Sequence, residues 1–139
     1  SQLEMSRDKL KSKLFEAIGI IISECGDENW DGFGALPISP DSVRRMKEYI
    51  GDMFASKLFN FNKIKIGVTP WPTGDLSIDF LKRGQEGETL VSITPNEEDI
   101  LYIARGKNLS RQGRSTHNIN SIYELFKTYF GFQYGVLER

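Results

Sequence analysis

The hydrophobic pattern of the chain changes its period near residue 60, and this change constrains the fold more than any other feature. Before it, apolar residues recur at the spacing of one helix face over residues 3–24: Leu3, Leu10, Leu14, Ile18 and Ile21. After it, apolar residues alternate with others, as they do at Ile64, Ile66 and Val68. Helices that precede a run of strands are typical of the α+β class.

Four short alternating segments predict a four-stranded antiparallel meander. They lie near residues 64–68, 76–81, 90–93 and 100–103, and short polar or proline-containing turns join them. An antiparallel sheet of this kind buries one face, so we expect the helices to pack on one face of it. The polar residues 105–118 are expected to form a long loop.

Helix-capping residues predict the ends of two further helices. Ser39 is a good N-cap, Pro40 suits the first helical position, and this helix should end near Lys57. The last helix should run from about Asn120 to Phe130, with Gly131 as its C-terminal cap. The predicted order is therefore ααββββα, in a single domain over residues 1–139.

Composition and charge narrow the class of protein. The 18 basic and 19 acidic residues leave a net charge of −1, which argues against a dedicated nucleic-acid binder. The single cysteine, Cys25, cannot form an intrachain disulfide, which fits a reducing compartment. No apolar run approaches the roughly 18 residues of a membrane span, and the charged start does not resemble a signal peptide. We expect a cytoplasmic protein that does not associate with a membrane.

Catalytic and metal-binding residues are sparse. His117 is the only histidine, so an enzyme of the nucleophile–histidine type would have to use it, and no nucleophile motif surrounds Cys25. Two carboxylate clusters, at residues 27–31 and 97–99, have the oxygen ligands that Mg²⁺ prefers, but they are typical of a loop start and a turn. We therefore expect no metal or cofactor, and we keep an enzyme using His117 as an alternative.

A basic stretch in the expected loop supports a different alternative. Arg105, Lys107, Arg111 and Arg114 follow one another without an intervening acidic residue. A flexible basic loop can reach a phosphate backbone, so nucleic-acid binding through these residues is the second functional hypothesis.

Two tryptophans lie in conformationally restricted segments and are the main candidates for partner binding. Trp30 and Phe33 belong to the stretch Asn29-Trp30-Asp31-Gly32-Phe33-Gly34-Ala35-Leu36-Pro37. There Gly32 and Gly34 should supply positive φ angles, and Asp31 should close an Asx-turn. Trp71 lies between two prolines. Each tryptophan can either pack on the core or anchor a partner, and for Trp30 the packing role is favoured.

These two segments resemble a group of small bacterial proteins that have no assigned activity. The shared stretches are N-W-D-G-aromatic-G-A-x-P, followed by P-x-P-x-G on two paired strands, and they correspond here to residues 29–37 and 70–80. The resemblance implies a bacterial or mobile-element source and transfers no catalytic residue. The leading hypothesis is a non-enzymatic protein-interaction or regulatory module that binds an unidentified protein partner.

Overall fold

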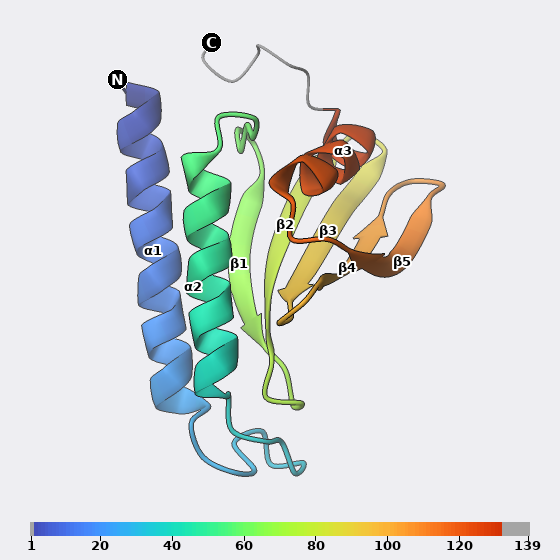
Figure 1. Cartoon of the computed structure of the whole chain (residues 1–139). Helices are drawn as coiled ribbons and strands as arrows, with labels where there is room; N and C mark the ends of the chain where they lie inside the picture. The colour runs from blue at the N-terminus through green and yellow to red at the C-terminus, as the bar shows by residue number, and fades with distance from the viewer. Residues whose placement is uncertain (1, 132–139) are drawn as a thin grey trace.

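The computed structural model describes residues 2–131, with side chains from residue 6 onward, so the expected core position of Leu3 lies outside the described side chains. Three helices and five strands follow one another along the chain (Figure 1). The helices are α1 (Gln2–Glu24), α2 (Pro40–Ala55) and α3 (Ile119–Phe130). The strands are β1 (Lys65–Pro70), β2 (Leu76–Gly84), β3 (Gly87–Pro95), β4 (Ile100–Arg105) and β5 (Ser110–Ser115). None of the helices in the described range is long and apolar enough to cross a membrane.

The strands form an antiparallel meander in the order β1-β2-β3-β4-β5. The α+β class is therefore confirmed, but the predicted count of four strands and the order ααββββα are wrong. Residues 105–118, expected to be a loop, contain β5. Its sequence, Ser-Arg-Gln-Gly-Arg-Ser, has no apolar alternation, and what makes it a strand is backbone pairing with β4 across a turn in which Gly106 N–H donates to Leu109 O.

One face of the sheet carries the apolar residues and faces the helices. The register places Ile78 opposite Ile93 and Phe80 opposite Val91, and all four side chains are fully buried. Helices α2 and α3 cover this face, and α1 lies beside α2 (Figure 1). The ring of Phe126 in α3 meets that of Phe80 edge-on, with centroids 4.7 Å apart. The opposite face of the sheet is here called the open face. It carries the residues that alternate along each strand with these apolar ones.

The predicted caps are confirmed. Ser39 has extended backbone angles, and its Oγ accepts a hydrogen bond of 3.0 Å from Ser42 N, while Pro40 starts α2. Gly131 ends α3 in the left-handed conformation, with φ of 73°. Because both caps rely on contacts within a few residues, they can be recognised from local sequence.

The C-terminal end of α2 is closed by a residue from α1. The Arg7 guanidinium donates hydrogen bonds to the backbone oxygens of Phe54, Ser56 and Phe59, at 3.1, 2.8 and 3.2 Å. Carbonyls at a helix end have no partner within the helix, so this side chain satisfies groups that would otherwise need water. Burial lowers the pKa of Arg7.

Candidate interaction site

Residues 29–37 form a closed loop, here called the display loop. The Asp31 carboxylate accepts hydrogen bonds from Phe33 N at 2.8 Å and Ala35 N at 3.0 Å, which confirms the expected Asx-turn. Asn29 adds two bonds of 2.7 Å: its amide oxygen accepts from Gly34 N–H, and its own backbone N–H donates to Ala35 O. Gly32 and Gly34 have φ angles of 78° and 87°, as predicted. The backbone of the display loop is therefore held by its own side chains.

The display loop is joined to residues 70–75, here called the hairpin turn, which connects β1 to β2. Leu36 N–H donates to Pro72 O at 2.8 Å, and Ser39 N–H donates to Gly74 O at 3.0 Å. Gly74 has a φ of 88°, and a Cβ atom there would lie 2.9 Å from Pro37 O. The display loop and the hairpin turn thus meet in space as one hydrogen-bonded unit at one end of the molecule (Figure 1).

This unit holds three large apolar side chains at the surface. Phe33 is 93% exposed, Leu36 is 55% exposed and Trp71 is 43% exposed. Trp30 behaves differently, because it is half-buried against the core and its Nε1 donates to Leu36 O at 2.7 Å. Of the three residues predicted to bind a partner, Phe33 and Trp71 are presented to solvent, whereas Trp30 supports the loop.

A groove runs from Trp71 across the open face of the sheet. Its volume is about 530 Å³, and Trp71, Thr94, Leu101, Ile103 and Gln112 are among the residues that line it. Leu101 and Ile103 alternate with the inward-facing Ile100, Tyr102 and Ala104 of β4, so this strand has apolar residues on both faces. The groove therefore has aromatic and aliphatic walls, and its polar lining combines hydroxyl side chains with the carboxylate of Asp75 and the guanidinium of Arg114.

The four basic residues of the nucleic-acid hypothesis do not form one patch. The β4–β5 register places Arg111 beside Ala104 on the helix-covered face and Arg114 beside Leu101 on the open face. Lys107 pairs with Glu86 at 2.9 Å. Arg114 pairs with Asp99 at 3.0 Å and holds the pKa of that carboxyl below its usual range.

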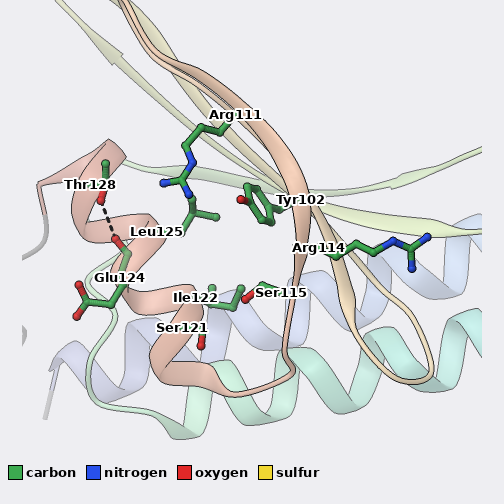
Figure 2. A pocket seen from close by; sticks show the side chains of 9 residues that line it. All are labelled: Tyr102, Arg111, Arg114, Ser115, Ser121, Ile122, Glu124, Leu125 and Thr128. Carbon is green, nitrogen blue, oxygen red and sulfur yellow. Dashed lines mark hydrogen bonds between the residues drawn. The ribbon is translucent and has the colours of Figure 1, made fainter.

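Figure 2 shows the separation of the two arginines of β5. A cavity of about 290 Å³ lies between this strand and α3, where Tyr102, Leu125 and Thr128 are among its lining residues. Arg111 points toward α3, and Arg114 points away on the other side of the strand. Both arginines are among the residues that line the cavity, but only the Arg111 side chain points toward α3.

The residues considered for catalysis are not assembled into a site. His117 is exposed in the connection between β5 and α3, where it is close enough to Asp99 to contribute to the lowered pKa of that carboxyl, but it lines neither the groove nor the cavity of Figure 2. Cys25 is buried at the end of α1, and burial raises the pKa of its thiol. Among the residues that the structure describes, no three His, Cys, Asp or Glu side chains are grouped so that they could hold a metal ion.

The sequence did not predict that Leu101 and Ile103 form an apolar wall of the groove or that Leu36 is exposed. A signal was present at β4, because an unbroken run of apolar residues, Ile100 to Ile103, exceeds what one buried face of an antiparallel strand requires.

The comparison with known proteins adds no information about this site. Protein-family models, curated protein sequences and solved structures give no match to the chain.

Proposed function

We propose that this protein is a non-enzymatic protein-interaction module of a bacterial or mobile-element system. A partner would dock on the surface formed by the display loop, the hairpin turn and the adjoining groove. The observation that carries the proposal is the presentation of Phe33, Leu36 and Trp71 on backbone that is already held by hydrogen bonds.

The energetics of such a surface favour association. Burying one large apolar side chain contributes about 1.5–3 kcal/mol, and Phe33 contributes almost none of this in the free protein because it is 93% exposed. Binding to a flexible loop is weakened by the entropy of ordering it. Here the Asx-turn and the bonds to the hairpin turn have already ordered the loop, so a partner gains the burial of Phe33 at a small conformational cost.

The groove extends this surface onto rigid strands. Trp71 belongs to both parts, since it lies in the hairpin turn and lines the groove. Aromatic residues seated beside apolar pockets commonly dominate the energetics of protein interfaces.

Affinity capture with matched variants tests the proposal. The full chain, immobilised by a terminal tag, is used as wild type, Phe33→Ser, Trp71→Ala and the control Leu109→Ser. Leu109 is 57% exposed in the β4–β5 turn, away from the display loop. Proteins captured by wild type and the control, but lost from both site variants, are then purified and their direct binding is measured.

We expect at least one direct binding partner whose affinity falls by about tenfold or more in both Phe33→Ser and Trp71→Ala, as for interface anchors. Equal capture by all four proteins would refute the proposal. Each variant must first show the wild-type melting temperature, so that a loss of binding is not a loss of folding.

A further inference from the structure

A hydrogen-bond network centred on Asp79 lies on the open face beside Trp71. The Asp79 carboxylate accepts from the hydroxyls of Ser77 at 3.0 Å, Ser92 at 2.6 Å and Thr69. Ser77 in turn accepts from Trp71 Nε1 at 2.8 Å. The members come from β1, β2, β3 and the hairpin turn, so the network depends on the assembled sheet.

All three hydroxyl groups of this network donate to the Asp79 carboxylate. A hydroxyl has one hydrogen to donate and two lone pairs that accept. Ser77, Ser92 and Thr69 each direct that hydrogen at Asp79, and the indole N–H is directed at Ser77. What remains for a ligand is lone pairs, and Ser92 presents them in the groove because it lines it. A group that binds here must therefore donate hydrogen bonds.

In the described part of the chain, Asp79 takes part in hydrogen bonds and not in an ion pair. Arg114, the basic residue that lines the groove, is three strands away and paired with Asp99. Gly67 is directly opposite Asp79 on β1, and the space where its side chain would be is open. This open space is on the β1 side of Asp79; toward the groove, which Asp79 does not itself line, the network presents the hydroxyl of Ser92.

The groove adds an aromatic surface and apolar walls to this arrangement. Trp71 is 43% exposed and lines the groove, with Leu101 and Ile103 on the opposite wall. The indole ring attracts a cation over its face, and a guanidinium both stacks on such a ring and offers several donors in one plane.

We infer that the groove takes an arginine side chain of a partner polypeptide, with its guanidinium between Trp71 and Ser92, the hydroxyl of the Asp79 network that lines the groove, and with its apolar neighbours against Leu101 and Ile103. The inference rests on the proposed interaction function and names the chemistry of the partner segment. Arginine fits better than lysine, because one planar group can satisfy several acceptors while it covers the ring.

An NMR titration of the full chain tests this assignment. The probes are acetyl-Leu-Arg-Leu-amide and the same peptide with citrulline, which keeps the shape of arginine but has no charge and has a carbonyl oxygen in place of one NH2 donor. The chain has two tryptophans, and a Trp71→Phe spectrum assigns the two indole N–H signals. The Trp30 signal is an internal control, since its indole donates to Leu36 O and not to the Asp79 network.

We expect the arginine peptide to shift the Trp71 indole signal in a saturable way while the Trp30 signal stays in place. The citrulline peptide should bind about tenfold more weakly, since hydrogen bonds to charged groups are the stronger ones. Equal binding of the two peptides, equal shifts of both indole signals, or no shift with either peptide would overturn the inference.

A charge-removing variant gives a second readout. Asp79→Asn should abolish the preference for arginine over citrulline, whereas Asp52→Asn, at an exposed carboxylate of α2, should preserve it. If Asp79→Asn does not fold, Ser92→Ala removes one groove acceptor, and the preference should then narrow. A preference unchanged by every folded variant of the network would refute the assignment.

The two proposals fail in different ways. Capture that depends on Phe33 and Trp71 without an arginine preference would leave the interaction function and remove only the arginine assignment. If the groove prefers arginine but no captured protein depends on Phe33 and Trp71, the arginine site is supported and the proposed interaction function is refuted.

Discussion

Replacement of Gly74 by alanine should be strongly destabilising, because this residue lies where the display loop and the hairpin turn meet. Gly74 has a left-handed φ of 88°, and its carbonyl accepts the hydrogen bond from Ser39 N. A methyl group at Gly74 would lie 2.9 Å from Pro37 O, a backbone atom that cannot rotate away. The display loop would have to move away from the hairpin turn.

The magnitude follows from two contributions. A left-handed conformation costs an L-residue roughly 1–2 kcal/mol. Moving the loop weakens the bonds Leu36 N to Pro72 O and Ser39 N to Gly74 O, and each such bond contributes about 1 kcal/mol. We therefore expect Gly74→Ala to lower the free energy of unfolding by about 3 kcal/mol, which for a chain of this size lowers Tm by about 8–10 °C.

Two other glycines separate the contributions. Gly32 also has a positive φ, of 78°, but a Cβ there meets nothing within 4 Å, so Gly32→Ala should show only the roughly 1–2 kcal/mol of strain. Gly67 in β1 has neither a positive φ nor a close neighbour, so Gly67→Ala should stay within about 0.5 kcal/mol of wild type.

Urea unfolding followed by tryptophan fluorescence and circular dichroism measures the three variants. The unfolding slope m should be unchanged if only the folded state is affected. A Gly74→Ala variant as stable as Gly67→Ala would refute the close contact between the loop and the hairpin turn. If Gly74→Ala and Gly32→Ala lower the free energy of unfolding equally, backbone strain alone explains the effect and the contact of the methyl group with Pro37 O contributes nothing.

Three other perturbations probe the fold and its charges. Arg7→Met should lower the free energy of unfolding in urea by about 3 kcal/mol, because three carbonyls lose a charged donor. The control Lys13→Met, on the exposed side of α1, should stay within about 0.5 kcal/mol of wild type. Equal effects of the two substitutions would contradict the capping role of Arg7. Burial and the raised thiol pKa should make Cys25 react slowly with iodoacetamide until urea unfolds the chain, and equal rates in both states would contradict its burial. The pKa of Asp99, lowered by Arg114, should rise toward the ordinary aspartate value in Arg114→Gln when followed by carbon-detected NMR. Because the folded pKa is the lower one, this pair favours folding above the ordinary aspartate range and loses its effect as pH falls through the lowered pKa.

Local interactions explain which parts of the fold could be predicted. The caps at Ser39 and Gly131 and the Asx-turn at Asp31 each depend on bonds that span a few residues. The alternation of Ile78 and Phe80 with more polar neighbours in β2 is enough to predict that one face of the sheet is apolar and buried. Patterns of this kind are complete within a short window of sequence.

The remaining features depend on residues that are distant along the chain. The strand β5 carries no apolar alternation and exists through its pairing with β4, so its sequence resembles a loop. Once it is a strand, its pleat sends Arg111 and Arg114 to opposite faces, which separates residues that look like one basic cluster.

The amino-acid sequence by itself determined the α+β class, the caps and the rigid display loop, because these follow from local periodicity and short-range hydrogen bonds. Only the tertiary structure decided that the display loop meets the hairpin turn, that Trp71 reaches Ser77, and that Asp79 collects hydroxyls from neighbouring strands. Strand register sets these contacts, and register is a property of the whole sheet.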